Sequence, residues 1–475
     1  MMSYLILPYE IIEWGIRLVM LVVVPYHRKP VSAMAWLLII FFLPIPGLLL
    51  FLLIGEYRIP RRRIQRHREL LQAIKSGRRD SAARPYIAGP ELGKEMSSTF
   101  ALAKSLGDFP ILGGNDLELL TETDEVITRI IADVDAAQHH VHVLFYIFAD
   151  DETGRRVAEA LARAVHRGVV CRVLVDAVGS RGMVRTLGPM MKENGILLKE
   201  SMPVGLFRRR MARVDLRNHR KIVVIDGRLG YTGSQNIVNA DYGRRGVAYT
   251  DLMVRLAGPT VLELQGVFLS DWYFETRELL DDEDIYPTPA LKGAGLIQTL
   301  PSGPNYPTDN YQRLLVAALY EAREQVVLTT PYFVPDEPFM QALEVAVRRG
   351  VKVDLIVPEH CDHIVVGAAS RAYYDDLLAI GVKVHLYRPG ILHSKTMSID
   401  RGLALIGTGN FDIRSFTLDF EVNLICYGRE MTDRLREVQG SYLRDSVPLD
   451  PLAWKQRPMT RRLVQNMAKL FSPVL

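Results

Sequence analysis

A long apolar stretch near the start of the chain predicts contact with a membrane. Residues 36–54 consist almost entirely of Leu, Ile and Phe, and no charged residue occurs from Met34 to Gly55. A helix of this length extends about 28 Å, close to the hydrocarbon thickness of a bilayer. Pro44 and Pro46 interrupt the pattern, so a kinked or re-entrant hairpin is the alternative to one straight transmembrane helix.

The preceding apolar stretch, Tyr4–Val24, contains charge. Its charged residues are spaced by three and four positions and share one helical face, where Glu13 can pair with Arg17. We interpret it as a second span whose polar face contacts a partner helix, with an interfacial helix as the alternative. Together the two stretches predict an N-terminal transmembrane helical hairpin. The charged residues are Glu10, Glu13 and Arg17.

Basic residues flank the second stretch on both sides. The run that follows it is the denser one, which places the rest of the chain in the cytoplasm if both stretches span. Next to a membrane, these side chains favour contact with anionic lipid over a merely solvated helix face. They are Arg58, Arg61, Arg62, Arg63, Arg66 and Arg68 after the stretch, and His27, Arg28 and Lys29 before it.

Beyond a polar linker the chain alternates between strand and helix patterns, and their order occurs twice. FYIFADDETG at 145–154 corresponds to PYFVPDEPFM at 331–340, and AVHRGVVCRVLV at 164–175 corresponds to AVRRGVKVDLIV at 346–357. A duplication this long predicts two similar α/β halves, each a sheet flanked by helices. The predicted organisation is a membrane anchor at 1–60, a basic and polar linker at 61–114, and halves at 115–290 and 291–475.

Composition narrows the class of protein without identifying a substrate. The hydrophobic content of 48% favours a folded, membrane-associated protein, and the net charge of +4 does not demand a nucleic-acid partner. The three cysteines, Cys171, Cys361 and Cys426, are far apart and form no CxxC pair. This spacing predicts reduced thiols rather than a disulfide framework or a zinc site.

The strongest chemical signal is one motif that occurs in both halves. Each copy contains a histidine, a lysine, an aspartate, a hydroxyl residue and an asparagine at the same offsets, and the copies are separated by the length of the repeat. Such a match in register is not expected by chance. The members are His219, Lys221, Asp226, Ser234 and Asn236 in the first half and His393, Lys395, Asp400, Thr408 and Asn410 in the second.

Strand geometry divides the motif into two parts. Side chains alternate along a strand, so the histidine and lysine of each copy share one face. An imidazole beside an ammonium group suits a phosphate, because the lysine holds anionic oxygens while the histidine attacks or donates a proton. Asp226 and Asp400 have the opposite parity and begin turns. We therefore expect their carboxylates to hydrogen-bond the backbone beneath the site.

The remaining members of the motif predict substrate contacts. Asn236 and Asn410 follow the next strands and can donate to phosphate oxygens, and Ser234 and Thr408 lie beside them in the sequence. Two histidines, two lysines and two asparagines supply what phosphoryl transfer requires. The sequence therefore predicts an enzyme that uses neither a metal nor another cofactor.

The duplicated motif resembles that of the phospholipase D superfamily, over roughly residues 115–475. The resemblance implies two halves packed about a pseudo-twofold axis, with both motifs in one active site. It implies a covalent phosphohistidine, with His219 as nucleophile and His393 as acid and base. It also implies that a carboxylate after each motif orients the histidine of the other half. Asp251 and Glu421 are the candidates, with ordinary surface ion pairs as the alternative.

Within the superfamily the chain is most similar to the bacterial cardiolipin synthases. The similarity lies in SAMAWLLII at 32–40, LPIPG at 43–47, NFDIRS at 410–415 and FEV at 420–422. It implies transfer of a phosphatidyl group between two phosphatidylglycerol molecules, with release of glycerol. It also implies a multi-pass protein of the bacterial inner membrane, with its catalytic part in the cytoplasm and anionic lipids as partners; homo-oligomerisation is left open.

Two further segments predict contact with lipid. Phe207–Arg210, with Arg213 and Arg217, forms a basic run before the first motif that would gather anionic headgroups, and a solvated loop is the alternative. Residues 461–475 predict a C-terminal amphipathic helix that either lies on the bilayer surface or packs on the domain.

Three other functions are compatible with the motif. A phospholipase D that hydrolyses lipid shares the covalent intermediate and differs only in using water as the acceptor. A membrane-tethered nuclease would need a basic groove interleaved with aromatic residues. The arginines cluster near the apolar segments instead, so nucleic acid is not an expected partner. A scaffold with inactive motifs is disfavoured because both copies retain every member.

Overall fold

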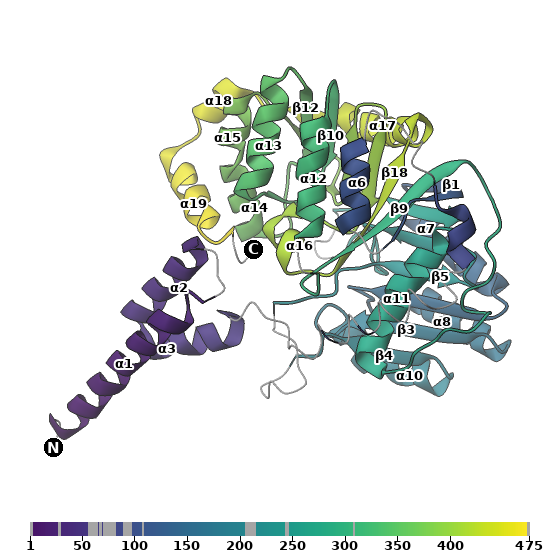
Figure 1. Cartoon of the computed structure of the whole chain (residues 1–475), viewed down its shortest axis with the longest axis horizontal. Helices are drawn as coiled ribbons and strands as arrows, with labels where there is room; N and C mark the ends of the chain where they lie inside the picture. The colour runs from purple at the N-terminus through teal and green to yellow at the C-terminus, as the bar shows by residue number, and fades with distance from the viewer. Residues whose placement is uncertain are drawn as a thin grey trace. The chain divides into compact units, whose positions relative to one another are not determined.

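The computed structural model describes residues 3–26, 30–55, 65, 69, 82–88, 97–106, 109–204, 215–242, 247–306 and 309–472. The chain divides into two compact units (Figure 1). An N-terminal unit comprises Met1–Arg61 with Val204–Leu216, and a main unit comprises Arg62–Pro203 with Arg217–Leu475. The predicted basic runs at 27–29 and 58–68, and the arginines at 208–210 and 213, lie outside the described residues.

The N-terminal unit is helical, and proline determines where its helices break. Pro44 has no N–H to donate to the preceding turn, so one helix ends at Phe42 and another begins at Pro44. Gly47 allows these two helices to approach closely, because a Cβ atom there would lie 2.9 Å from Cα of Ile40. The elements are α1 (Ser3–Val23), α2 (Pro30–Phe42), α3 (Pro44–Leu50) and a π-helical turn (Phe51–Gly55).

The straight apolar helix predicted over residues 36–54 is not formed, because the prolines divide it into α2 and α3. In the described part of the chain, no helix combines the length and apolar composition needed to cross a membrane. α1 has 21 residues but contains the three charged residues noted above. Its predicted ion pair is present, with Arg17 Nη2 3.2 Å from Glu13 Oε2.

The main unit is built on one continuous 15-stranded sheet (Figure 1). Its strand order is β19-β13-β12-β10-β15-β16-β18-β9-β1-β8-β6-β5-β2-β3-β4. From β9 outward the strands follow in the order β18, β16, β15, β10, β12 and β13. From β1 outward the order is β8, β6, β5, β2, β3 and β4, so the two halves connect their strands in the same way. The two halves join where β1 pairs antiparallel with β9. The predicted α/β class and internal duplication are thus confirmed.

The strands of the first half are β1 (Leu112–Leu120), β2 (His140–Phe145), β3 (Val170–Asp176), β4 (Leu197–Ser201), β5 (Ile222–Ile225), β6 (Leu229–Gly233), β7 (Tyr249–Thr250) and β8 (Met253–Ala257). Those of the second half are β9 (Gly295–Ser302), β10 (Gln325–Thr329), β11 (Phe333–Val334), β12 (Lys352–Pro358), β13 (Lys383–Tyr387), β14 (Ile391–Leu392), β15 (Thr396–Ile399), β16 (Leu403–Gly407), β17 (Phe411–Asp412), β18 (Glu421–Tyr427) and β19 (Ser446–Pro448).

The helices of the main unit before β9 are α6 (Ser97–Leu106), α7 (Thr123–Ala136), α8 (Glu152–His166), α9 (Arg181–Thr186), α10 (Gly188–Glu193) and α11 (Val261–Thr276), with a 3₁₀ turn at Arg84–Tyr86. Those after it are α12 (Asn310–Glu321), α13 (Glu337–Arg348), α14 (Ile364–Ala372), α15 (Tyr374–Ile380), α16 (Ile413–Thr417), α17 (Arg429–Arg444), α18 (Pro451–Lys455) and α19 (Met459–Lys469).

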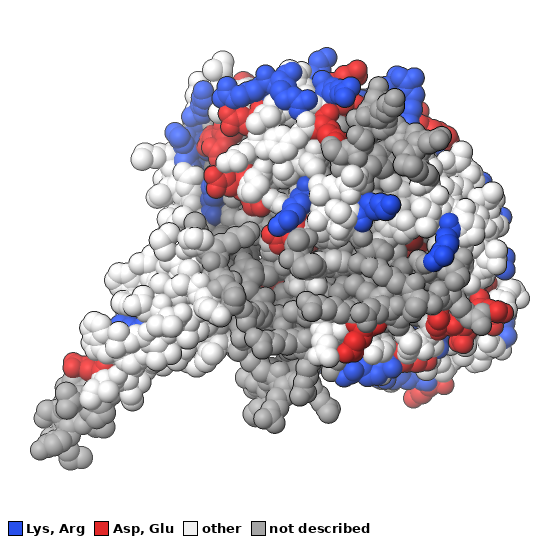
Figure 2. Space-filling view, in the orientation of Figure 1, with Lys and Arg blue, Asp and Glu red and all other residues white. Residues whose placement is uncertain are grey.

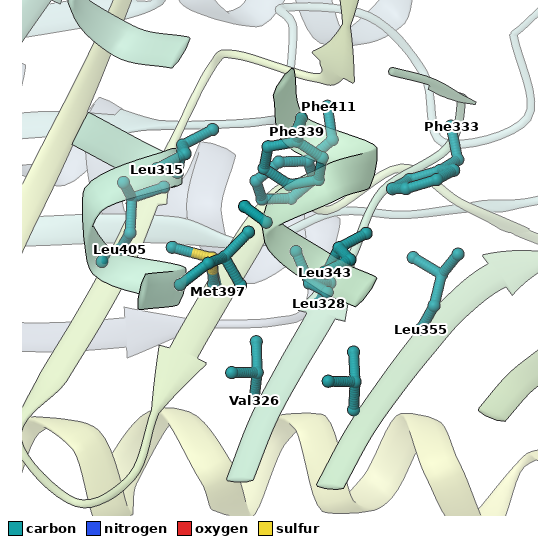
Figure 3. Packing of buried hydrophobic residues seen from close by; sticks show 14 of the residues in the cluster. Leu315, Val326, Leu328, Phe333, Phe339, Leu343, Leu355, Met397, Leu405 and Phe411 are labelled. Atoms are coloured by element: carbon teal, nitrogen blue, oxygen red, sulfur yellow. The ribbon is translucent and has the colours of Figure 1, made fainter. Parts of the chain in front are cut away.

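Helices cover both faces of the sheet because its strands are apolar on both sides. In β10, Val326 and Leu328 point into the core beneath α12 and α13, whereas Val327 lies in a separate cluster with Tyr442 of α17. Figure 3 shows residues of the first of these clusters, in which Phe339 of α13 lies beside Phe411. On the opposite face, α11 and α17 cover strands of both halves in one shared cluster.

The repeated sequence produces matching local structure in the two halves. Asp151 caps the N-terminus of α8 by accepting from Gly154 N at 2.9 Å, and Asp336 caps α13 by accepting from Phe339 N at 3.2 Å. Each helix is followed by a glycine with positive φ, Gly168 at 93° and Gly350 at 90°. The repeat therefore preserves the start and the end of each of these helices.

The motif aspartates fix the backbone at one end of each half. Asp226 and Asp400 adopt positive φ values of 53° and 50° in the turns after β5 and β15. The carboxylate of Asp226 accepts from three consecutive backbone N–H groups, those of residues 138–140, at 2.8–3.0 Å. The carboxylate of Asp400 accepts from those of residues 323–325 at 2.7–2.9 Å. Among the described residues, neither carboxylate hydrogen-bonds a motif histidine or lysine, so each acts on the scaffold.

We predict that Asp400→Asn lowers the free energy of unfolding by about 1–3 kcal/mol, because an amide cannot accept from all three N–H groups as a carboxylate does. Thermal unfolding of the full chain in detergent would measure the change. Asp116→Asn, on an exposed position of β1, is the matched control and should leave the melting temperature unchanged. Equal melting temperatures for Asp400→Asn and the unsubstituted protein would contradict this role.

Candidate active site

The two motifs meet because each half pairs its backbone with the other. His219 N donates to Phe420 O at 2.9 Å, and His393 N donates to Thr250 O at 2.8 Å. The second contact belongs to a short parallel pairing between β14 and β7. Each histidine is thereby placed beside the residue that follows its backbone partner, which is Glu421 in one case and Asp251 in the other.

Each histidine contacts a carboxylate of the opposite half. His219 Nδ1 lies 3.1 Å from Glu421 Oε1, and His393 Nδ1 lies 2.7 Å from Asp251 Oδ1. Both carboxylates are buried, so neither is an ordinary surface ion pair. A carboxylate at Nδ1 fixes the tautomer that leaves Nε2 available for chemistry. The arrangement is the exchange between halves that the resemblance implied.

The serine and threonine of the motif hold these carboxylates. Ser234 Oγ donates to Asp251 Oδ1 at 2.6 Å, and Thr408 Oγ1 donates to Glu421 Oε2. Both hydroxyls also accept from the backbone N–H of the residue after the carboxylate, and both side chains are fully buried. Each hydroxyl is thus engaged below the site, and the predicted contact of Ser234 and Thr408 with substrate stays a prediction.

The motif lysines are buried cations close to the histidines. Lys221 Nζ donates to His219 O at 2.7 Å, and Lys395 Nζ donates to His393 O at 2.5 Å. Burial lowers the pKa of Lys221 to about 8 and that of Lys395 to about 7, against the opposing attraction of nearby carboxylates. An anion bound between them would favour the protonated forms of both.

Burial also shifts the histidines and the carboxylate of one pair. It lowers the pKa of His219 well below its usual range, and Lys221 adds to the effect. Burial raises the pKa of Glu421 to about 7, although Lys221 opposes this shift. The pKa of His393 is likewise lowered by burial and by Lys395. Burial and the neighbouring lysines therefore favour neutral imidazoles.

The pKa values of the two orienting carboxylates are shifted in opposite directions. Burial acts to raise the pKa of Asp251, yet the net shift is downward because His393, Lys395 and Ser234 stabilise its carboxylate. Glu421 is shifted upward instead. Asp251 is thus the stronger support for a positively charged imidazole, which suits His393 as a proton donor.

The two motif asparagines are not equivalent. Asn236 Oδ1 accepts from Ile147 N at 3.1 Å, so it supports the backbone that follows β2. Asn410 is also buried, but its Oδ1 has no hydrogen-bond partner in the described structure. A buried amide oxygen without a partner is unusual in a folded protein. The second-half asparagine is therefore the one with an unpaired acceptor.

Aromatic residues and one acid line the site, and the motif gave no sign of them. The rings of Tyr146 and His219 are 4.7 Å apart edge to face, and those of Tyr249 and His393 are 5.9 Å apart. Asp362 accepts from Tyr332 OH at 2.6 Å and from Tyr249 OH at 3.1 Å. Tyr146 and Tyr332 hold matching places in the repeat, which is the one sequence signal that could have found them.

The arginines beside the first motif are structural. Arg217 is buried, with Nη1 3.1 Å from Asp176 Oδ1. Arg220 is also buried, with Nη1 2.7 Å from Asp271 Oδ1, and it donates to Glu421 O at 3.0 Å. The predicted headgroup contact of Arg217 is therefore wrong, because its charge is neutralised inside the main unit. In the described ranges, no group of three or more His, Cys, Asp or Glu side chains is arranged to hold a metal ion.

Comparison with known proteins places this geometry in a family. The family model described as "Cardiolipin synthase, PLD-like domain" matches residues 130–272 and 315–440. A second model, "Phospholipase_D-nuclease N-terminal", matches residues 16–56. The histidine and lysine of both motif copies lie within the residues matched by the cardiolipin synthase model.

Curated relatives match over almost the whole chain. Cardiolipin synthase A of Cronobacter sakazakii is 37% identical over 483 residues, which cover 98% of this chain and 99% of that protein. Cardiolipin synthase A of Salmonella arizonae is 37% identical over 477 residues, which cover 99% and 98%.

Among solved structures, the phosphatidylserine synthase of Haemophilus influenzae is similar in fold. It has a TM-score of 0.61 and 15% sequence identity, and the match covers 80% of this chain and 100% of that one. At this identity the likeness supports the fold alone.

The lysine pKa values predict how turnover of a phosphodiester substrate depends on pH. A lysine with a lowered pKa loses its charge as the pH rises through that value, so kcat/KM should begin to fall between about pH 7 and 8. Steady-state rates from pH 5 to 10 would test this, with Lys192→Gln, at the last turn of α10, as a control that keeps the same profile. A flat profile up to the range of an ordinary lysine would contradict it.

Proposed function

The chain belongs to the cardiolipin synthase family of the phospholipase D superfamily, and on that premise we propose how its residues transfer a phosphatidyl group. The donor and the acceptor are both phosphatidylglycerol, and the products are cardiolipin and glycerol. The observation that carries the proposal is the pair of buried histidine–carboxylate contacts, one from each motif and each made across the two halves.

In the first step, Nε2 of His219 attacks the phosphorus of one phosphatidylglycerol. A P–N bond forms and the P–O bond to the glycerol headgroup breaks. His393 gives its Nε2 proton to the departing glycerol oxygen, which leaves as an alcohol. Nε2 is the reacting nitrogen in both residues because Nδ1 is engaged by Glu421 or Asp251.

In the second step, a glycerol hydroxyl of another phosphatidylglycerol attacks the phosphohistidine. His393, now neutral, takes the hydroxyl proton as the new P–O bond forms and the P–N bond to His219 breaks. The histidines return to their starting states, and no other reactant is consumed. The difference between Asp251 and Glu421 supports this division of roles, because Asp251 has the lowered pKa and stabilises a charged His393 more strongly.

Lys221 and Lys395 hold the non-bridging phosphate oxygens in this scheme. Both are buried and close to the histidines, so an anion between them would interact in a medium of low dielectric constant. The phosphodiester charge also offsets the burial that disfavours a protonated His393 in the empty site. The amide N–H groups of Asn236 and Asn410 would add donors to the phosphate oxygens.

We further propose that the N-terminal unit attaches the enzyme to the bacterial inner membrane, with the main unit on the cytoplasmic side. Much of the side-chain surface of α1–α3 is exposed and apolar, including Val22 of α1 and Phe42 of α2. The kink between α2 and α3 suits a re-entrant hairpin more than a straight span. The arginine-rich sequence after this unit favours the cytoplasmic side.

The products formed from phosphatidylglycerol vesicles test the transferase. We expect cardiolipin and glycerol in equal amounts, because one molecule of each is released per transfer. Lipid chromatography with a glycerol assay would quantify both products, and His219→Ala should form neither. Phosphatidic acid that accumulates without cardiolipin would identify water as the acceptor and contradict the proposal.

The assigned roles of the histidines predict which variant traps the intermediate. With phosphatidylglycerol labelled at phosphorus, label should build up slowly on His393→Ala, which lacks the proton donor of the first step, and should then remain bound because the acceptor hydroxyl is not deprotonated. It should be absent from His219→Ala. Gel autoradiography at alkaline pH, where phosphohistidine survives, would detect it. His166→Ala, on an exposed position of α8, controls for loss of a histidine. The reverse pattern of labelling would exchange the two roles.

A further inference from the structure

The last helix of the main unit, α19, packs on the domain with its apolar side exposed. Of its residues, Gln465 and Ala468 are the buried ones. The large apolar residues of the helix and the turn after it have exposed fractions between 52% and 71%. Such an arrangement leaves apolar surface in water unless another surface covers it. The exposed residues are Leu463, Val464, Met467, Leu470 and Phe471.

The inner side of this segment is held by polar contacts. Lys469 Nζ lies 2.7 Å from Asp376 Oδ2, and its ammonium group sits 4.3 Å from the centre of the Tyr373 ring. Tyr373 OH is hydrogen-bonded to Ser472 Oγ at 3.2 Å. Gln465 accepts from Arg457 Nε at 2.9 Å. These contacts fix the orientation of α19, so its outward face is built into the fold.

More exposed apolar side chains lie on the neighbouring elements. α14, which packs along α19, begins with Ile364 at 87% and Val365 at 51% exposure. Leu452 of α18 and Met459 at the start of α19 are exposed by 71% and 86%. We call the exposed apolar side chains of α14, α18, α19 and the turn after α19 the outer apolar face.

The charge of this segment indicates what covers the outer apolar face. Residues 451–472 contain five basic residues and no acidic one. Arg461 and Arg462 are exposed on α19 itself. In Figure 2, Lys and Arg side chains lie along the edge where Figure 1 draws α18 and α19, with Asp and Glu side chains beside them, and Arg457 and Lys469 pair with Asp375 and Asp376. Apolar side chains flanked by the exposed Arg461 and Arg462 fit the surface of an anionic bilayer.

The outer apolar face begins next to the active site. Ile364 follows Asp362 by two positions, and the Asp362 carboxylate accepts from Tyr249 OH. The ring of Tyr249 in turn lies edge to face with that of His393. A lipid surface in contact with the start of α14 would therefore lie near His393, the residue proposed to activate the acceptor.

We propose that the outer apolar face docks the main unit onto an anionic phospholipid surface and so presents lipid headgroups to the His393 side of the site. This proposal rests on the proposed function, since it gives the route by which the substrate lipids arrive. It adds a contact with the bilayer that is separate from the N-terminal unit. The apolar side chains enter the headgroup region, and Arg461 and Arg462 bind lipid phosphates.

A spin label at position 467 would test the docking in the full chain. The label is introduced as Met467→Cys in a Cys361→Ser background, because Cys361 is the one cysteine that is not buried. Collision rates with oxygen, which enters bilayers, and with a nickel chelate, which stays in water, are measured after reconstitution into vesicles. Leu279→Cys, exposed by 55% after α11, provides the matched label away from the outer apolar face.

In phosphatidylglycerol vesicles we expect the label at 467 to meet oxygen but not nickel, and the label at 279 to meet nickel. Phosphatidylcholine vesicles should restore contact between nickel and the label at 467, because the arginines lose their anionic partners. A label that meets nickel in both vesicles would overturn the proposal. So would a label shielded from both reagents, since a second copy of the chain or its own N-terminal unit would then cover the face.

Activity distinguishes failure of the docking from failure of the proposed function. The double variant Val464→Glu with Met467→Glu should lose at least about tenfold of its rate on phosphatidylglycerol vesicles, because two apolar side chains no longer enter the bilayer. Its rate in mixed detergent–lipid micelles should stay the same, and Leu279→Glu should be unaffected in both. Equal rates on vesicles would overturn the docking. An unsubstituted protein without transferase activity in micelles would overturn the proposed function alone.

Discussion

The active site depends on two buried contacts that cross from one half of the chain to the other. Neither His219 nor His393 takes its carboxylate partner from its own half. Glu421 and Asp251 are both buried, and a buried carboxylate without a partner is strongly destabilising. The two halves must therefore pack together before either histidine is oriented. A separated half would contain a histidine without its carboxylate and a carboxylate without its histidine, with no working site.

The rest of the main unit keeps these contacts in register. The β1–β9 pairing joins the halves into one sheet, and β9 also pairs with β18, the strand that begins at Glu421. Asp226 and Asp400 hold the starts of β2 and β10 from the turns that follow the motif strands. The motif thus supplies both the reacting groups and the contacts that tie its strand to the next one. Burial then disfavours charged histidines and lysines in the empty site, and a phosphodiester supplies the missing negative charge.

Much of this could be predicted from the sequence because duplication and strand parity are local properties. The alternation of side chains along a strand was enough to assign His219 and Lys221 to the reacting face and Asp226 to the scaffold. The repeat indicated two similar α/β halves. The contacts of Ser234 and Thr408 were not foreseen because their partners, Asp251 and Glu421, are brought beside them only by the pairing of β6 with β8 and of β16 with β18. Arg217 was misassigned for the same reason, since Asp176 approaches it only in the folded sheet. Asp362 and its tyrosines were missed because backbone pairing between halves brings Tyr249 beside His393. The domain boundaries remain predictions.

The C-terminal helix shows a further limit of periodicity. The spacing of Leu463, Val464 and Met467 predicts an amphipathic helix, but the same spacing serves a helix that packs inward or outward. The contacts of Lys469, Gln465 and Ser472 decide between them, and those partners are distant in sequence. An enzyme whose donor and acceptor are both lipids must receive two molecules from one surface. An outward apolar face beside the acceptor side of the site meets that requirement, whereas a tether in the N-terminal unit alone would leave the orientation of the main unit undefined.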